Sequence, residues 1–157
     1  MVKTLAEGQK APDIKLPTDG GGSFDLAALI GRKAVVYFYP KNDTSGCTNE
    51  ALDFSAGRAA FEAADTELVG ISTDTAASHD KFKAKHKLDI TLASDEEKQV
   101  VEAYGVWREK SMYGRKYMGI ERTTFLIDRQ GLIAHIWRKV KVPGHAEEVL
   151  KAALALG

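Results

Sequence analysis

The chain has 157 residues, with 22 basic and 22 acidic side chains and a formal net charge of zero. This length suits a single domain, residues 1–157, whose hydrophobic core needs neither disulfide bonds nor metal ions. The balanced charge does not favour nucleic acid or an acidic membrane as a partner. A single cysteine excludes an internal disulfide framework, a cysteine-cluster metal site and dithiol chemistry of the C-x-x-C type.

The sequence also bears on where the protein resides. It contains no run of about 18 apolar residues, so it predicts no membrane-spanning helix. The segment from Met1 to Gly8 lacks the apolar centre of a secretory signal. We therefore expect a cytoplasmic protein in a reducing compartment, without a membrane partner.

In the first part of the chain, an apolar strand is expected to lead into a helix. Residues 1–33 predict an N-terminal extension of extended pieces and turns, since Pro12 and Pro17 interrupt any helix. Ala34 to Tyr39 form a continuous apolar and aromatic run, which is typical of a buried central strand. Helical spacing then runs from about Cys47 to Ala64. The inward side of that helix is expected to carry Ala51, Phe54, Arg58 and Phe61.

The middle of the chain predicts alternating strands and helices. A short apolar strand is expected at Glu67 to Ser72, followed by a helix at Ser78 to His86 with Phe82 inward and its lysines in water. A further strand is expected at Asp89 to Ala93. A helix is expected from Glu96 to Tyr104, ended by the glycine that follows it.

The last part of the chain predicts a hairpin and a terminal helix. Thr123 to Asp128 and Leu132 to Trp137 are apolar runs joined by a short turn with glycine, which is typical of two antiparallel strands. Gly144 to Leu156 is amphipathic, and its inward side is expected to carry Val149, Leu150, Ala153 and Leu154. The resulting order, β-α-β-α-β-β-α, is that of a thioredoxin-like α/β fold, with a central mixed β-sheet flanked by helices.

The only cysteine stands where the predicted central strand passes into the predicted helix. Backbone N–H groups in the first turn of a helix lack intrahelical partners, so they stabilise an anion placed there. Cys47 is therefore expected to be a reactive thiolate, the nucleophilic form of cysteine. Thr44 and Glu50 lie three residues before and after it, where they can cap or orient the first turn. The competing interpretation is an inert, buried thiol, because free cysteine often packs as a small hydrophobic side chain.

Several motifs occur in order along the chain. The pattern Pro-x-x-x-Thr-x-x-Cys is met by Pro40, Thr44 and Cys47. Further stretches are Gly70 to Asp74, Ser78-His79 with Phe82, Gly105 to Trp107, and Gly119 to Gly131. Together these residues resemble the peroxiredoxins, and within them the bacterioferritin comigratory protein (peroxiredoxin Q) group. The resemblance extends from about Gly8 to the terminal helix.

The resemblance implies a thiol peroxidase, an antioxidant enzyme of cell redox homeostasis that reduces hydrogen peroxide and organic hydroperoxides. Cys47 would be the peroxidatic nucleophile and would become a sulfenic acid. Arg122 would stabilise the charge on the leaving oxygen, together with backbone N–H groups near Gly46. Thr44 would align the peroxide, and Pro40 would shield the sulfur.

The same resemblance gives Glu50 a supporting role, in which it orients Arg122 or its neighbours. No cofactor and no metal are implied. The histidines lack the spacing of a metal site and are expected on helix surfaces or strands: His79, His86, His135 and His145. A hydrophobic rim or partner surface is the expectation for a group of large side chains: Trp107, Tyr113, Tyr117 and Met118.

The chain departs from the group at the resolving cysteine. Many members carry it five residues after the peroxidatic one, where this chain has Leu52, and others carry it around Phe82 to Lys87, where this chain has none. A sulfenic acid on Cys47 would then need an external thiol: glutathione with glutaredoxin, a thioredoxin, another small thiol, or Cys47 of a second subunit. We expect Leu52 to pack in the core, and the helix start to be more stably folded than in two-cysteine relatives.

Two other functions remain open from the sequence. A peroxide sensor or relay would use the same site but pass oxidation to a partner protein, and only turnover with a reductant separates it from an enzyme. A thioredoxin-fold interaction or holdase module would carry an inert thiol, recognised by an alkylation rate no faster than that of free cysteine. The protein is expected to be a monomer or a weak homodimer.

Overall fold

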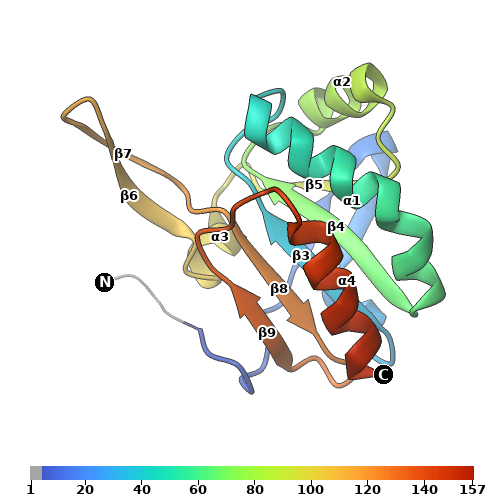
Figure 1. Ribbon diagram of the computed structural model, residues 1–157. Coiled ribbons are helices and arrows are strands. Elements are labelled where there is room, and N and C mark those ends of the chain that lie inside the picture. Colours follow the sequence, from blue (N-terminus) through green and yellow to red (C-terminus); the bar gives the residue numbers. More distant parts are fainter. Residues whose placement is uncertain (1–4) are drawn as a thin grey trace.

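The computed structural model describes residues 5–157, so the expectation about a signal sequence in Met1 to Gly8 lies partly outside the described residues. A five-stranded sheet forms the centre of the molecule, in the order β5-β4-β3-β8-β9 (Figure 1). Its strands are β3 (Lys33–Phe38), β4 (Thr66–Ser72), β5 (Thr91–Ser94), β8 (Thr123–Ile127) and β9 (Ile133–Trp137).

The central sheet is mixed. β3 pairs in parallel with β4, and β4 with β5, whereas β8 runs antiparallel to both β3 and β9. All residues of β3 are buried, as the apolar run predicts, because this strand lies in the middle of the sheet. The predicted thioredoxin-like α/β fold is therefore confirmed, and the hairpin predicted near the C-terminus is β8–β9.

Helices and the N-terminal extension cover the two faces of the sheet. One face packs against α1 (Ser45–Ala63), α2 (Ala76–His86) and α4 (His145–Leu156). Of these, α1 and α4 lie side by side in front of the sheet (Figure 1). The other face packs against the N-terminal extension and α3 (Gln99–Ala103). Successive residues of β3 point to opposite faces, so Val35 and Tyr37 enter one core while Val36 and Phe38 enter the other.

The N-terminal extension consists of short pieces, as expected. Strands β1 (Lys15–Pro17) and β2 (Ser23–Asp25) pair antiparallel around the 3₁₀ turn η1 (Asp19–Gly21). A second 3₁₀ turn, η2 (Leu26–Leu29), leads to the central strand β3. Buried side chains of this extension, among them Ile14 and Phe24, close the second core.

A second hairpin, which the sequence analysis did not predict, leaves the body of the molecule between α3 and β8. It consists of β6 (Trp107–Met112) and β7 (Arg115–Ile120), and it projects away from the sheet (Figure 1). Its turn residues, Tyr113 and Gly114, have φ values of 53° and 76°, which suits a two-residue hairpin turn. Most of its side chains are exposed, so its strands lack the apolar alternation by which a strand is recognised in sequence.

Two helices differ from the predicted details. Helix α3 begins at Gln99, later than predicted, because Lys98 takes the left-handed conformation with φ of 63°. In α4, Leu154 was expected inside but is 59% exposed, since Val149 and Ala153 already form the buried row of that helix. These differences lie at element ends and leave the architecture unchanged.

Side chains on α1 and two histidines also depart from expectation. Phe54 and Phe61 of α1 are buried as predicted, but Arg58 lies at the surface, where it forms an ion pair with Glu62 at 2.7 Å. The expectation that the histidines lie on helix surfaces or strands is wrong for two: His79 of α2 and His145 of α4 are buried. Burial is possible because each imidazole finds hydrogen-bond partners inside the protein.

Candidate active site

Cys47 is the third residue of α1, directly after the loop that leaves the carboxyl end of β3. The residue is 1% exposed and forms no disulfide. The first backbone N–H groups of the helix are clustered around this turn, and their positive end favours negative charge on the sulfur. The predicted strand-to-helix junction at the thiol is therefore present.

Arg122 joins the thiol to a carboxylate. This residue lies in the link between β7 and β8, and its Nη2 donates to Cys47 Sγ at 3.3 Å. Its Nη1 donates to Glu50 Oε1 at 2.6 Å. Glu50 follows Cys47 by three residues, so both side chains lie on one side of α1 and face the same guanidinium. The structure thus brings together three residues that the sequence analysis had selected.

Burial sets the protonation behaviour of this cluster. The Glu50 side chain is 2% exposed, and its Oε2 has no partner among residues 5–157. Burial raises the pKa of Glu50 to about 7, although the charge of Arg122 opposes the rise. For Arg122, burial lowers the pKa, but the charges of Glu50 and Cys47 outweigh it and raise the pKa above its ordinary value. The guanidinium therefore remains a fixed cation beside the sulfur.

The remaining predicted residues belong to the loop and the first turn that lead to the thiol. Thr44 occupies the N-cap position of α1, but its Oγ1 donates to the Lys41 carbonyl at 3.0 Å and makes no capping bond to the helix. Pro40 is half-buried directly after the central strand. At Gly46, a Cβ atom would lie 3.3 Å from Arg122 Nη2, so the absence of a side chain gives the guanidinium room beside the sulfur.

A buried polar network, which the sequence analysis missed, holds the loop between β3 and α1. The Asn42 side chain accepts from Tyr39 Oη at 2.6 Å and donates to His79 Nδ1 at 2.9 Å. The Nε2 of His79 donates to the Ala93 carbonyl at 3.0 Å, which makes Nδ1 the acceptor. The backbone N–H of Asn42 donates to Asp74 Oδ2 at 2.9 Å. The motif Ser78-His79 was visible in the sequence, but its contact with a loop far away in the chain was not.

The prediction for Leu52 is wrong. Its side chain was expected in the core, but the residue is 41% exposed. The reason is helical geometry: Ala51 and Phe54 already occupy the inward positions of this part of α1, and Leu52 falls about 100° away from Ala51 around the axis. The stability of the helix start therefore cannot rest on burial of this leucine.

The described residues show neither a metal cluster nor a membrane span. Among residues 5–157, no three histidine, cysteine, aspartate or glutamate side chains are grouped as a metal would need. None of the helices in the same range is both long enough and apolar enough to cross a bilayer.

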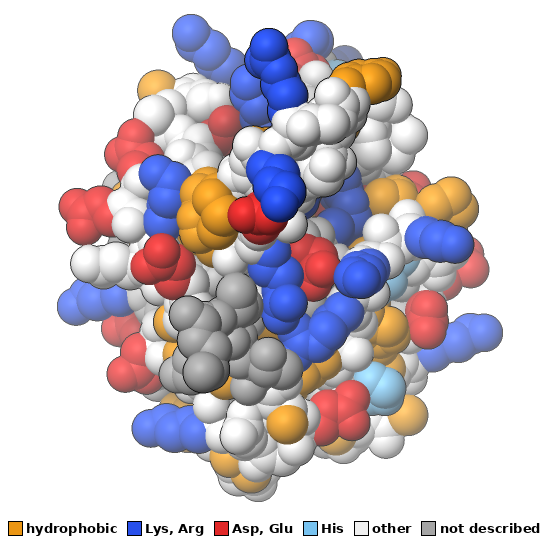
Figure 2. All heavy atoms as spheres, turned by 90° about the vertical axis from the view of Figure 1, so that its left-hand side faces the viewer, with side chains coloured by type: hydrophobic (Ala, Val, Ile, Leu, Met, Phe, Trp, Pro, Cys, Tyr) orange, Lys and Arg blue, Asp and Glu red, His pale blue; other side chains and the backbone are white. Residues whose placement is uncertain are grey.

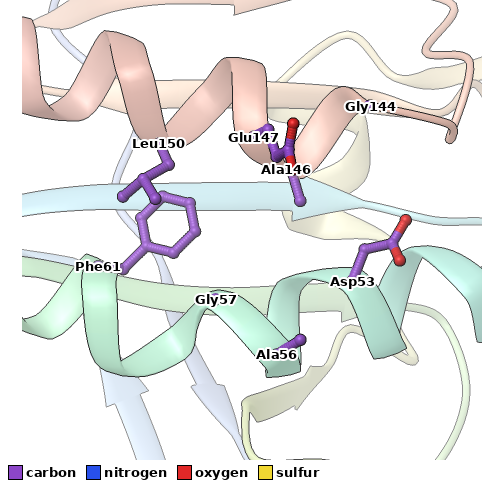
Figure 3. Close-up of a pocket in the computed structure, with 8 residues that line it drawn as sticks. All are labelled: Asp53, Ala56, Gly57, Phe61, Gly144, Ala146, Glu147 and Leu150. Carbon is purple, nitrogen blue, oxygen red and sulfur yellow. The ribbon is translucent and has the colours of Figure 1, made fainter.

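A separate groove lies between α1 and α4, with a volume of about 570 Å³ (Figure 3). Phe61 and Leu150 approach each other at one end, Asp53 lies toward the other, and Glu147 lies between them. The residues that line the groove do not include Cys47, so this groove is distinct from the thiol site.

Comparison with known proteins identifies the family of the chain that carries this thiol, guanidinium and carboxylate. Residues 7–136 match the AhpC/TSA family. The chain belongs to this family. It is 50% identical to the putative peroxiredoxin Bcp of Coxiella burnetii, over 94% of this chain and 97% of the relative. It is 46% identical to peroxiredoxin Bcp of Bacillus subtilis, over 94% of both chains.

Solved structures agree with the sequence relatives. A structure of Xanthomonas campestris bacterioferritin comigratory protein, from work on its alkyl peroxide reduction activity, is 42% identical with a TM-score of 0.89. The match covers 96% of this chain and 98% of that protein. The chain is thus an enzyme of the peroxiredoxin class, in the Bcp or peroxiredoxin Q group, and it lacks a resolving cysteine because Cys47 is its single cysteine.

Proposed function

We propose that this peroxiredoxin reduces hydrogen peroxide and organic hydroperoxides through a sulfenic acid on Cys47. The observation that carries the proposal is the Arg122 guanidinium, which donates to Cys47 Sγ at 3.3 Å and is held by Glu50 at 2.6 Å. A fixed cation with planar donors stabilises the thiolate and the negative charge that develops on the leaving oxygen. The alkyl peroxide reduction activity of the Xanthomonas relative supports organic hydroperoxides as substrates here.

In the oxidation step, the Cys47 thiolate attacks the terminal oxygen of the hydroperoxide. The S–O bond forms as the O–O bond breaks, so sulfur loses two electrons and the peroxide gains them. The leaving hydroxide or alkoxide takes up a proton and departs as water or alcohol. Arg122 and the free N–H groups at the start of α1 stabilise the charge, while Thr44 aligns the peroxide and Pro40 limits access of water to the sulfur.

In the reduction step, an external thiolate attacks the sulfur of the Cys47 sulfenic acid, so that an S–S bond forms, the S–O bond breaks and the oxygen leaves as water. A second thiolate then attacks this mixed disulfide and releases Cys47. The chain contains no second cysteine, so no intramolecular disulfide can form. The proposed reductants are a thioredoxin, or glutathione with glutaredoxin, which suits the expected cytoplasmic location. A slow reductant would leave the sulfenic acid open to overoxidation to sulfinic acid.

The test is stopped-flow tryptophan fluorescence of the reduced protein mixed with hydrogen peroxide, with Cys47→Ser as the matched control. We expect a peroxide-dependent phase faster than free cysteine by about two orders of magnitude or more, absent from the variant. Intact mass of quenched samples should show one added oxygen. A rate no better than free cysteine by both measurements would contradict the proposal.

Turnover then separates the enzyme from a peroxide sensor. With excess peroxide and each candidate reductant, the enzyme is expected to consume many equivalents of peroxide per protein. Consumption that stops after one equivalent with every reductant, while a partner protein becomes oxidised, would favour the sensor.

A further inference from the structure

Two acidic side chains share one guanidinium in the buried site. Arg122 donates through Nη2 to Cys47 Sγ at 3.3 Å and through Nη1 to Glu50 Oε1 at 2.6 Å. Both acidic groups are almost fully buried, since Cys47 is 1% exposed and the Glu50 side chain 2%. A thiolate and a carboxylate together would therefore place two negative charges beside one positive charge away from water. Such an arrangement is costly, because a buried charge needs a partner of its own.

The groups closest to Glu50 do not supply a second positive charge. Among residues 5–157, the ion pair of Glu50 is with Arg122 alone. Asp53, three residues further along α1, adds negative charge and so disfavours ionisation of Glu50. Burial raises the pKa of Tyr37 and of Tyr39 well above the ordinary value, so both hydroxyl groups stay neutral.

Two basic residues respond to the same guanidinium. Burial lowers the pKa of His145 on α4 and of Lys110 on β6, and the positive charge of Arg122 acts in the same direction. Neither of them forms an ion pair with Glu50 in the described part of the chain. The balance of charge in the buried site therefore depends mainly on Cys47, Glu50 and Arg122.

Glu50 Oε2 is the atom on which a proton would reside. Oε1 accepts from Arg122, whereas Oε2 is buried and has no partner among residues 5–157. A proton on Oε2 removes the charge of the carboxylate but keeps the bond from Arg122, because a protonated carboxyl group still has an accepting oxygen. The pKa of about 7 for Glu50, raised mainly by burial, agrees with this placement. A thiolate on the same guanidinium raises that pKa further, since like charges disfavour each other.

Resting on the proposed peroxidase function, we propose that Glu50 holds a proton while Cys47 is a thiolate and gives it up when Cys47 becomes a sulfenic acid. As the S–O bond forms and the O–O bond breaks, the leaving hydroxide or alkoxide needs a proton. That proton comes from Glu50 Oε2, so Glu50 becomes negative as the sulfur becomes neutral. Arg122 is paired first with the thiolate and then with the carboxylate, and the cluster of three groups has no net charge in either state.

The same exchange runs in reverse when the sulfenic acid is reduced. Two external thiols bring two protons to the reaction and leave as a disulfide. One proton departs in the water formed from the sulfenic hydroxyl group, and the other returns to Glu50 as the Cys47 thiolate forms again. Because its bonded partner is Arg122, Glu50 is a positioning residue whose proton is coupled to the sulfur through that guanidinium.

Surface charges have little part in this balance. On the molecular face that carries the hairpin β6–β7, Lys and Arg side chains lie among Asp and Glu side chains (Figure 2). Exposed charges of both signs offset one another, and salt screens them beyond about 10 Å at 0.1 M. The proton exchange of the buried cluster is therefore expected to persist when salt is added.

The test is infrared difference spectroscopy of the reduced protein before and after one equivalent of hydrogen peroxide, at a pH slightly above 7. The ultraviolet absorbance of the thiolate shows that Cys47 is ionised at the start. We expect the carbonyl band of a protonated carboxyl group to disappear on oxidation. Glu50→Gln should lack this change, whereas Glu62→Gln, at an exposed position of the same helix, should keep it. A carboxyl band that persists through oxidation, or that disappears equally in Glu50→Gln, would overturn the assignment.

Proton counting gives a second readout, which a merely structural role would not change. Oxidation of a thiolate takes up about one proton from solution when no stored proton is present, and this amount is expected for Glu50→Gln. Wild type and Glu62→Gln should take up less just above pH 7, by as much as about one proton. The deficit should vanish at low pH, where Glu50 keeps its proton in both states, and at high pH, where it has none in either.

The shape of this pH profile is decisive even if Glu50→Gln does not fold. Wild type alone should show a minimum of proton uptake just above pH 7, together with the infrared change. Uptake that does not vary with pH while Cys47 remains a thiolate, or equal uptake by wild type and Glu50→Gln at every pH, would overturn the assignment.

A thiol reagent separates this inference from the proposed function. If hydrogen peroxide fails to oxidise wild-type Cys47, the peroxidase proposal fails. Methyl methanethiosulfonate then converts the Cys47 thiolate into a neutral mixed disulfide without peroxide chemistry. The carboxyl band is expected to disappear in this reaction too, and its persistence would overturn the coupling between Glu50 and the sulfur. A sulfenic acid that forms normally while the carboxyl band stays unchanged would reject the role of Glu50 alone.

Discussion

Among single residues, Arg122 has the central position because its two terminal nitrogens bond to different groups. One nitrogen donates to Cys47 Sγ and the other to Glu50 Oε1, across separations of 75 and 72 residues in sequence. The carboxylate holds the guanidinium in place, and the guanidinium supplies charge at the sulfur. The geometry depends on a planar, forked cation, which lysine cannot reproduce.

We predict that Arg122→Lys retains the fold but lowers the second-order rate with hydrogen peroxide by about tenfold to a thousandfold. A lysine ammonium keeps the charge but cannot donate to both partners along the same directions. Stopped-flow oxidation measures the rate, and Arg108→Lys, which changes another arginine of this region, is the control. A rate within about twofold of wild type would show that charge alone is sufficient.

Glu50 provides a prediction about pH and stability. Its pKa is 4.5 ordinarily and about 7 in the folded protein, mainly through burial, so folding favours the protonated form. Protonation of Glu50 therefore contributes to the free energy of unfolding. This contribution is fully present below about pH 4.5 and is lost as pH rises through about 7. Glutamine does not titrate, so the stability of Glu50→Gln relative to wild type is expected to rise by about 1–3 kcal/mol between about pH 5 and about pH 8.

Urea unfolding of both proteins across this pH range measures the difference. Glu62→Gln, which alters an exposed carboxylate on the same helix, serves as the control. A stability difference that stays constant with pH, or that falls as pH rises, would contradict the assigned protonation of Glu50.

Among the elements, the loop between β3 and α1 is held by contacts to α2 and β5. Asn42 contacts His79 of α2, and His79 in turn contacts the Ala93 carbonyl of β5. This network connects the start of α1 to two elements that follow much later in the chain. It gives a structural reason for a stable helix start that does not depend on Leu52, whose side chain is exposed.

We predict that Asn42→Ala destabilises the protein by about 2–4 kcal/mol and speeds amide exchange in residues 47–53. The substitution removes Asn42 as the partner of Tyr39 Oη and of His79 Nδ1, which lie 3.4 Å from each other, and a buried group left unsatisfied costs about 1–3 kcal/mol. Hydrogen exchange of the reduced protein measures the local effect. Asn49→Ala, at an exposed position of α1, is the matched control. Rapid exchange of residues 47–53 already in wild type would reject the predicted stable helix start.

For the whole molecule, two hydrophobic cores lie on opposite faces of one sheet. Trp107 packs against the core formed with the N-terminal extension, and Trp137 packs against the core formed with α1 and α4. β3 contributes side chains to both cores. Loss of one core should therefore remove support from the other through the shared strands.

We predict that the protein unfolds as one cooperative unit, as expected if residues 1–157 form a single domain. Trp107→Phe and Trp137→Phe leave one tryptophan each, so that fluorescence reports on each core separately. Urea transitions from the two variants should coincide with the far-ultraviolet circular dichroism transition of the same variant. Separate midpoints for fluorescence and circular dichroism within one variant would show that the two faces unfold independently.

The sequence by itself determined the features that depend on local pattern. The apolar run from Ala34 to Tyr39 identified the central strand, helical spacing identified α1, and their junction located Cys47 at a helix start. The order of strands and helices was sufficient for the mixed α/β sheet, because short connections and handedness allow few alternatives. The polar hairpin β6–β7 escaped this reasoning, since exposed strands carry no clear periodicity.

Only the tertiary structure decided what depends on distance through space and on burial. It set Arg122 at 3.3 Å from Cys47 Sγ, buried Glu50 so that its pKa rises, and exposed Leu52. The physical reason is that charge interactions and desolvation depend on which elements pack together, whereas sequence spacing reports only on neighbours within one element.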